Sequence, residues 1–179
     1  MEGTKQAIVL RDLSETELLN TQTEFGSSHT QAVPLSSEDL SDLKRGRPRI
    51  SDVYASPITN ENQIAVIRPI SLRDGTPAVL AITMPTFALH QVLNPSVPAG
   101  WVVGVGDRKG VYVTRSERHA DVSGKPGVAA YLRQAVGPSG SFTATNQFGE
   151  ELLAGYLRSG FSGWLYAANV PLATVEAPL

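Results

Sequence analysis

The residue types that most often carry out chemistry are scarce in this chain. None of its 179 residues is a cysteine, which excludes disulfide frameworks, thiolate zinc sites and cysteine nucleophiles together. The three histidines, His29, His90 and His119, fall in an expected polar loop, helix and loop, and none has a second ligand at metal spacing. No Gly-x-Ser-x-Gly elbow is present, although a Ser–His–Asp triad could still assemble in three dimensions. We therefore expect a binding protein that needs no cofactor or metal, with a small hydrolase as an alternative.

One basic segment resembles a DNA-binding motif. LKRGRPRI (43–50) contains the Arg-Gly-Arg-Pro pattern of hooks that place two arginines in the minor groove of A/T-rich DNA. Such hooks usually lie in strongly basic tails, whereas this chain has a net charge of −2. A helix end that runs through Gly46 and Pro48 into a strand accounts for the segment, so no nucleic-acid partner is expected.

A glycine-rich segment, GVGDRKG (104–110), does not match a phosphate-binding loop. Its third glycine comes one place too late for the dinucleotide fingerprint, and a strand follows in place of the helix. Phosphate binding needs the helix N-terminus that is missing there. The segment predicts a hairpin turn.

Polar side chains on two expected strands could line a ligand pocket. Because side chains alternate along a strand, Asp52, Tyr54 and Ser56 share one face. On the next strand Arg68 interrupts a face that is otherwise apolar. A buried guanidinium is costly without a partner. Arg68 therefore either pairs with a carboxylate such as Asp52 or grips a ligand carboxylate or phosphate with two bonds.

The elements that would position these residues follow a repeated order. The first half predicts strand, strand, helix, three strands and a further helix, over 7–13, 17–23, 36–46, 49–55, 63–70, 77–84 and 86–93. The second half predicts strands over 100–110, 111–116, 140–147, 151–159 and 163–170, with a helix from Pro126 to Gly137 carrying Val128, Leu132 and Val136 on one face.

Two pairs of residues align the halves. Asp12 matches Asp107 (107 − 12 = 95), and Pro85 matches Pro171 (171 − 85 = 86), which gives a period of roughly 90 residues. Short links between the strands predict an antiparallel sheet in each half, with helices to one side.

Composition fits a globular chain with a core. The hydrophobic fraction is 41% and the charged fraction 18%. No run approaches the ~18 apolar residues of a membrane span, and the N-terminus lacks the apolar core of a signal peptide. A strand-like run begins within the first ten residues, and the last residues, VPLATVEAPL, lead into no further expected element. We therefore expect a segment cut from a longer protein, with Met1 added.

Four phrases carry a resemblance to a known family: VLRDLSETELLNT, GRPRISDVYASPI, GWVVGVGDRKGVYVTRS and GWLYAANVPLATVEAPL. They resemble the double Cache sensors, in which two PAS-like units stand in tandem outside the bacterial membrane. The resemblance covers almost the whole chain. It implies an α+β fold of two tandem PAS-like (Cache) units, each an antiparallel sheet of about five strands flanked by helices. Residues 1–94 would be the membrane-distal, ligand-binding unit and 95–179 the membrane-proximal unit.

The same resemblance implies a function. The chain would be the extracytoplasmic, periplasmic sensing domain of an inner-membrane receptor, a sensor histidine kinase of a two-component system that acts as a homodimer. Its membrane contact would come only through flanking spans, and the domain itself would not be an enzyme. The sensor domain of a chemoreceptor or diguanylate cyclase, or a soluble PAS-like module, is the alternative.

The resemblance also bears on the ligand. Many amino-acid-binding double Cache domains end the last strand of the first unit with an aspartate that holds the ligand's amine, and here the run VLAITMP places Thr83 there. This departure argues against an amino acid. We expect a small anion or organic acid held by Arg68, Tyr54 and Thr83, beside Asp52 and Ser56. In the second unit Arg115, Tyr156 and Arg158 occupy comparable places under shorter loops.

Overall fold

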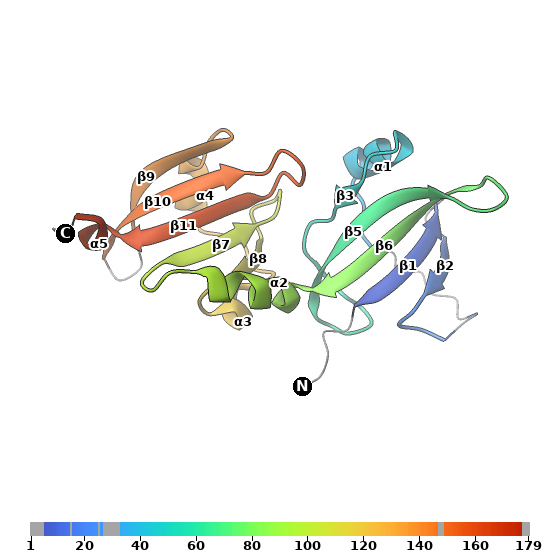
Figure 1. Cartoon of the computed structure of the whole chain (residues 1–179), viewed down its shortest axis with the longest axis horizontal. Coiled ribbons are helices and arrows are strands. Elements are labelled where there is room, and N and C mark those ends of the chain that lie inside the picture. The colour runs from blue at the N-terminus through green and yellow to red at the C-terminus, as the bar shows by residue number, and fades with distance from the viewer. Residues whose placement is uncertain (1–5, 15, 25, 27–32, 147–148, 177–179) are drawn as a thin grey trace. The chain divides into compact units, whose positions relative to one another are not determined.

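The chain folds into two compact units, each built on one antiparallel sheet (Figure 1). The computed structural model describes residues 6–14, 16–24, 26, 33–146 and 149–176. Unit 1 is Met1–Thr86 and unit 2 is Phe87–Leu179. The predicted division after residue 94 placed helix α2 (Thr86–Leu93) in the first unit, whereas the structure places all but its first residue in unit 2. The physical reason is that His90 of this helix bonds to a strand of unit 2.

Unit 1 contains a sheet in the order β2-β1-β6-β5-β3, with β4 also paired to β5. Its elements are β1 (Ala7–Asp12), β2 (Glu17–Asn20), α1 (Ser37–Lys44), β3 (Arg49–Ile50), β4 (Tyr54–Ala55), β5 (Asn62–Ser71) and β6 (Pro77–Pro85). The prediction of one continuous strand over 49–55 is wrong, because the Ser51 hydroxyl accepts the Ala65 N–H at 2.9 Å and replaces a ladder bond there.

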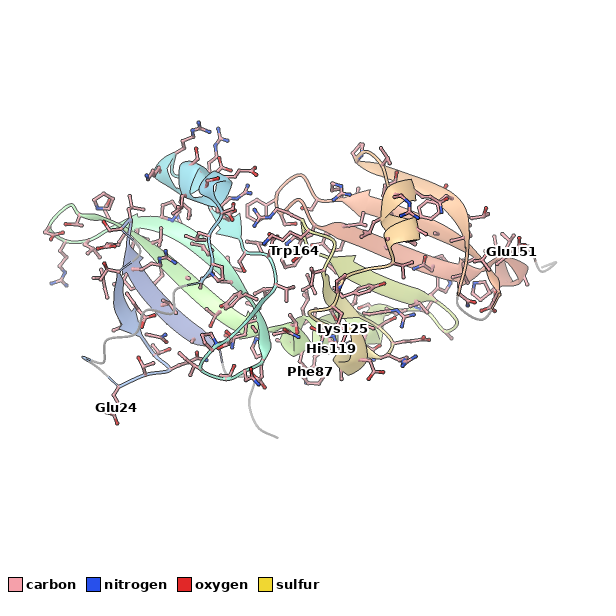
Figure 2. The ribbon with its side chains drawn as sticks, turned by 180° about the vertical axis from the view of Figure 1, so that it is seen from behind. Glu24, Phe87, His119, Lys125, Glu151 and Trp164 are labelled. Atoms are coloured by element: carbon pink, nitrogen blue, oxygen red, sulfur yellow. The ribbon has the colours of Figure 1, made fainter. Side chains whose placement is uncertain are left out.

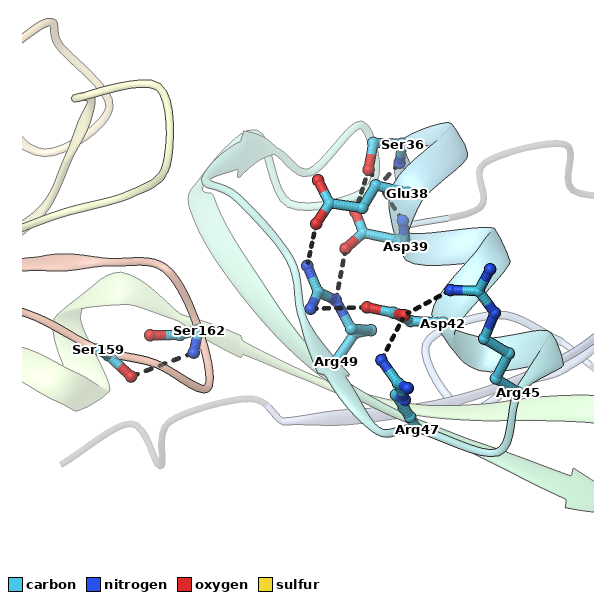
Figure 3. Close-up of polar contacts among 9 residues, drawn as sticks. All are labelled: Ser36, Glu38, Asp39, Asp42, Arg45, Arg47, Arg49, Ser159 and Ser162. Carbon is cyan, nitrogen blue, oxygen red and sulfur yellow. Dashed lines mark hydrogen bonds and ion pairs between the residues drawn. The ribbon is translucent and has the colours of Figure 1, made fainter. Parts of the chain in front are cut away.

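Ion pairs connect helix α1 to strand β3 of the sheet (Figure 3). Ser36 caps the helix, and Asp39 completes a capping box. The Arg49 guanidinium on β3 contacts Asp39 and Asp42, each at 3.0 Å. Arg47 also pairs with Asp42, at 3.4 Å. The basic segment that resembles a DNA hook is therefore an ordered helix end with its arginines turned toward carboxylates.

The core of unit 1 lies on one face of its sheet. Apolar side chains from three neighbouring strands pack against one residue of α1 and one of the segment before it. The buried cluster consists of Val9, Val33, Leu43, Ala65, Ile67, Val79 and Ala81. Leu13, Leu35 and Tyr54 are partly buried and pack against this cluster. We call this side of the sheet the covered face of unit 1, and the candidate ligand site lies on it.

Unit 2 contains a sheet in the order β8-β7-β11-β10-β9. Its further elements are η1 (Asn94–Ser96), β7 (Val102–Gly106), β8 (Tyr112–Arg115), α3 (His119–Val122), α4 (Ala129–Gln134), β9 (Ser139–Thr145), β10 (Glu151–Arg158), β11 (Leu165–Pro171) and α5 (Leu172–Glu176). Helices α3 and α5 were not predicted. Gln147, at the end of the predicted strand 140–147, lies outside the described residues.

Helix α4 is shorter than predicted. It spans six residues and lies over one face of the sheet (Figures 1 and 2). Val128 and Val136 lie just beyond its two ends and are 62% and 74% exposed. The predicted apolar stripe is therefore wrong except for Leu132, which is half-buried.

The two units repeat one topology, as the sequence predicts. Asp12 Oδ1 accepts the N–H groups of residues two and four places on, and Asp107 Oδ1 does the same. Pro85 ends β6 immediately before α2, and Pro171 ends β11 immediately before α5. The aligned residues thus close the same turn and end the same strand in both units.

Candidate ligand-binding site

The covered face of unit 1 has a row of small side chains across its three central strands. Thr83 on β6 stands opposite Ala7 on β1 and Ala65 on β5. Residues directly opposite in an antiparallel ladder point to the same side of the sheet. All three are buried. The covered face at this row therefore consists of small buried side chains.

Thr83 is the polar member of that row. It is 3% exposed, and its Oγ1 finds no hydrogen-bond partner among the described residues. A buried hydroxyl without a partner costs about 1–3 kcal/mol. Such a group in a native fold calls for a ligand or an ordered water. The residue expected to hold the ligand thus has a free bonding group inside unit 1.

Tyr54 lies over the same face. Its ring packs against the core cluster, and its hydroxyl donates to Gln63 Oε1 at 3.4 Å. Burial raises the pKa of the Tyr54 phenol above its ordinary value, so the group remains a neutral donor. Gln63 is itself buried and donates from Nε2 to Thr59 Oγ1 at 3.3 Å. Hydroxyl and amide groups therefore line this part of the interior.

Ser56 has a structural task in the same region. It is buried, and its Oγ accepts the N–H of Thr59 at 3.3 Å. Its main chain closes the turn that leads to β5, because Ser56 N–H donates to Glu61 O at 2.8 Å. The hydroxyl thus shapes the turn that carries Thr59 toward Gln63.

The structure does not bring Arg68 to this face. Ala65 and Ile67 are buried on β5, whereas Val66 and Arg68 alternate with them and are exposed. The expectation that Arg68 is buried in an apolar stripe is wrong, because the opposite face of the strand is the covered one. Asp52 is half-buried in the segment between β3 and β4, outside both strands.

Among the described residues of unit 1, Arg11 carries the buried guanidinium, and it was not predicted as a site residue. It is 1% exposed, and its Nη1 donates to Val33 O at 2.8 Å. Strand alternation after Ala7 and Val9 could have identified it, since these residues share its face. The bond to Val33 ties β1 to the segment before α1.

The comparable residues of unit 2 have different surroundings. Arg115 Nη1 donates to Glu117 O at 3.2 Å in an exposed position. The Tyr156 hydroxyl donates to Val136 O. Arg158 is half-buried and reaches two main-chain carbonyls. Nearby, burial, with the neighbouring Tyr112 and Tyr156, raises the pKa of Tyr131 to about 12.

Two histidines that are distant in sequence meet in unit 2. The rings of His90 and His119 stack with centroids 4.7 Å apart. Phe87 lies close to both rings, and Figure 2 shows it near His119. His90 Nδ1 donates to Arg115 O at 3.0 Å, and His119 Nδ1 shares a 3.1 Å hydrogen bond with the hydroxyl of Thr114. Burial, and then His90, lower the pKa of His119. Within the described residues, no group of three potential metal ligands occurs. His29 lies outside them.

The comparisons with known proteins identify the fold. No family model and no curated protein matches the chain. Similar solved structures include the ligand-binding domain of the Pseudomonas aeruginosa PAO1 amino acid chemoreceptor PctB in complex with L-Arg (TM-score 0.68, 15% identity, 97% of this chain and 74% of that one). Another is the Campylobacter jejuni chemoreceptor Tlp3 ligand-binding domain in complex with L-valine (0.60, 14%, 96% and 68%). A third is an extracellular domain assigned to a histidine kinase, rpHK1S-Z16 (0.66, 13%, 97% and 74%).

At these identities the likeness concerns the fold. The two antiparallel sheets with a few helices match the α+β architecture of Cache or PAS-like sensor domains. The chain covers 68–74% of the length of these three structures. In the described part of the chain, no helix is both long and apolar enough to span a bilayer.

Proposed function

We propose that this chain is the extracytoplasmic sensing domain of a bacterial membrane receptor and that it binds a small molecule. The observation that carries the proposal is the tandem fold, which the extracellular and ligand-binding domains of a histidine kinase and of chemoreceptors share over 96–97% of this chain. Fold alone does not imply function, so the chemistry of the interior must support it.

We propose that the ligand binds on the covered face of unit 1, against Thr83, Tyr54 and Gln63. The free hydroxyl of Thr83 supplies the reason for a ligand there. Because Arg68 faces outward and the buried Arg11 donates to Val33 O, the groups around Thr83 that this interior offers are hydroxyl and amide groups. It therefore favours a small polar molecule that is neutral or carries balanced charges. Since the Thr83 hydroxyl is inaccessible, residues packed against that face, Tyr54 among them, must move when the ligand enters.

Binding at Thr83 acts close to the end of unit 1. Thr83 lies near the end of β6, and the chain continues from Pro85 into α2 without a loop. A ligand that prefers one arrangement of β6 shifts the population toward that arrangement. The change then reaches the residues at which unit 2 begins.

For the full-length protein we propose a sensor histidine kinase that acts as a homodimer in the inner membrane. The resemblance of the sequence to kinase sensor regions supports this choice, as does the fold of the rpHK1S-Z16 domain. A chemoreceptor is the second candidate, favoured by the similarity to PctB and Tlp3. Apolar spans on both sides of this segment, followed by a kinase or a chemoreceptor module, would distinguish these outputs from a soluble binding protein.

A thermal-shift screen tests the binding proposal. Purified protein is heated with amino acids, amines, sugars, organic acids and inorganic anions. A ligand present at one hundred times its dissociation constant adds about 2.7 kcal/mol of stability. We expect a hit whose effect is lost in Thr83→Val and kept in Arg68→Ala, the exposed control on the neighbouring strand. A hit that Arg68→Ala abolishes and Thr83→Val leaves intact would contradict the proposed pocket.

A further inference from the structure

Unit 2 contains a small cavity of its own. Its volume is about 180 Å³, and it lies where the turn after β7 approaches α4 and the adjoining ends of β10 and β11. The lining consists of four residues of that turn and three from the other elements: Asp107, Arg108, Lys109, Gly110, Leu132, Arg158 and Leu165. At about 30 Å³ for each water in the liquid, the space corresponds to roughly six water molecules. It can therefore hold a ligand of a few heavy atoms.

The sheet register shows which positions lie on the side of the sheet that faces the cavity. Arg158 on β10 stands opposite Leu165 on β11, and Leu165 stands opposite Gly106 on β7. The three positions therefore point to the same side of the sheet. Gly106 has no side chain, and an added Cβ would be in ordinary van der Waals contact with Val111 O at 3.8 Å and Gly110 Cα at 3.9 Å. The cavity is thus flanked by a position without a side chain on one strand and by an arginine on another.

Arg158 has little to bond with inside the protein. Its Nη1 reaches Gly163 O at 3.4 Å, and its Nη2 reaches Ala135 O at 3.5 Å. Both distances are long for hydrogen bonds of this type. Within the described residues Arg158 forms no ion pair with a carboxylate. A half-buried guanidinium in this state lacks the planar, two-oxygen partner that its donors fit best.

Most of the charged side chains around Arg158 are cationic as well. Arg108 and Lys109 also line the cavity. Arg108 approaches the same glycine as Arg158, because a Cβ added to Gly163 would lie 3.0 Å from Arg108 Cγ. The carboxylate in the lining is Asp107, whose Oδ1 accepts two main-chain N–H groups of the turn. The lining therefore contains three cationic side chains and one carboxylate.

We propose that this cavity is a second binding site, which takes a small oxyanion, either the carboxylate of a short organic acid or inorganic phosphate. Arg158 grips two of its oxygens, and Lys109 adds charge from the turn. The chemistry that the sequence placed at Arg68 in the first unit thus belongs to Arg158 in the second. The site lies wholly in unit 2 and does not depend on the pocket proposed at Thr83.

Binding of acetate and of phosphate to the whole chain tests the proposal. Each anion is titrated in separate ¹H–¹⁵N correlation experiments, with chloride at equal ionic strength as the blank. We expect saturable shifts at the amides of Gly110 and Gly163 with at least one of the two. Acetate alone would identify a carboxylate site, phosphate alone a phosphate site, and both a general oxyanion site.

Variants locate the site. Arg158→Gln is expected to weaken binding at least tenfold, and Arg158→Lys by less, since it keeps the charge and loses the fork. Arg133→Gln, an exposed arginine on α4, is the matched control and should bind like the wild type. Thr83→Val should also leave anion binding intact, which separates this site from the one in unit 1. Should Arg158→Gln not fold, weaker binding by Arg158→Lys decides the question.

Two results would overturn the proposal. One is a response to both anions that never exceeds the chloride blank. The other is saturable binding that Arg158→Lys and Arg158→Gln leave at wild-type strength.

Discussion

Replacing Thr83 with valine is expected to stabilise the ligand-free protein. The Thr83 hydroxyl is buried without a partner among the described residues, a state that costs about 1–3 kcal/mol. Valine keeps the β-branched shape that suits a strand and removes the polar atom. Because a methyl group must fit where a hydroxyl was, the gain should fall at the low end. We expect the free energy of unfolding of unit 1 to rise by about 1 kcal/mol.

Thr114 offers a matched control in unit 2. It is 0% exposed and lies within strand β8, and its hydroxyl shares a hydrogen bond with His119 at 3.1 Å. Thr114→Val removes a bond that is made and leaves the ring nitrogen without it. The same substitution should therefore lower the free energy of unfolding by about 1–3 kcal/mol. Opposite signs for one chemical change separate a free hydroxyl from a bonded one.

Urea unfolding followed by two probes measures both effects. Trp101 and Trp164 both lie in unit 2, so tryptophan fluorescence reports on that unit, whereas far-UV circular dichroism reports on both. Thr83→Val should raise the urea midpoint for unfolding of unit 1, which is seen by circular dichroism and not by tryptophan fluorescence. Thr114→Val should lower the fluorescence midpoint. A loss of stability in Thr83→Val equal to that in Thr114→Val would refute the assignment of a free hydroxyl at Thr83.

Three further predictions concern the titration of His119, the ion pairs of Arg49 and the turn bonds of Asp12 and Asp107. Because burial lowers the pKa of His119 below its unfolded value of about 6.5, the unfolded chain binds more protons below that pH. Stability should be full above pH about 6.5 and fall with acidification, a slope that His119→Phe reduces in urea titrations at several pH values. Arg49→Met should cost about 3 kcal/mol of unfolding free energy, because it removes the cation between two carboxylates of α1, whereas exposed Arg45→Met should cost less than about 0.5 kcal/mol. Asp12→Ala and Asp107→Ala should each lower the free energy of unfolding by about 1–2 kcal/mol, measured by thermal unfolding, through loss of the same two turn bonds. An effect in one unit only would contradict the structural repeat.

The sequence predicts most of the architecture because local signals agree with the fold. Strand alternation acts within a few residues, and it appears in β1. Asp12 and Asp107, which align the two halves of the sequence, bind the same turn positions in the two units. The tandem order follows from the same signals repeated at a distance of roughly 90 residues. The break at Ser51 was missed, because it depends on a bond to a residue 14 positions away.

The candidate site was harder to predict. Alternation shows that Arg68 and Ile67 point to opposite faces of β5, but it does not show which face α1 covers. Thr83 was singled out through the resemblance to double Cache domains, and the structure shows that it is buried. Its contact with a ligand stays a prediction. Strand alternation would have identified Arg11, whereas the position of Arg158 opposite Leu165 depends on the register of β10 and β11. The stacking of His90 on His119 depends on α3, a helix of four residues with no sequence signal strong enough to predict it.

The central claim is that a small polar molecule binds inside unit 1, and amide mapping tests it most directly. The compound that raises the melting temperature most is titrated into ¹⁵N-labelled protein, and perturbed amides are assigned to elements. We predict shifts that concentrate on β4, β5 and β6 around Tyr54, Gln63 and Thr83, with the binding lost in Thr83→Val. Shifts confined to unit 2, or binding that Thr83→Val leaves unchanged, would contradict the account.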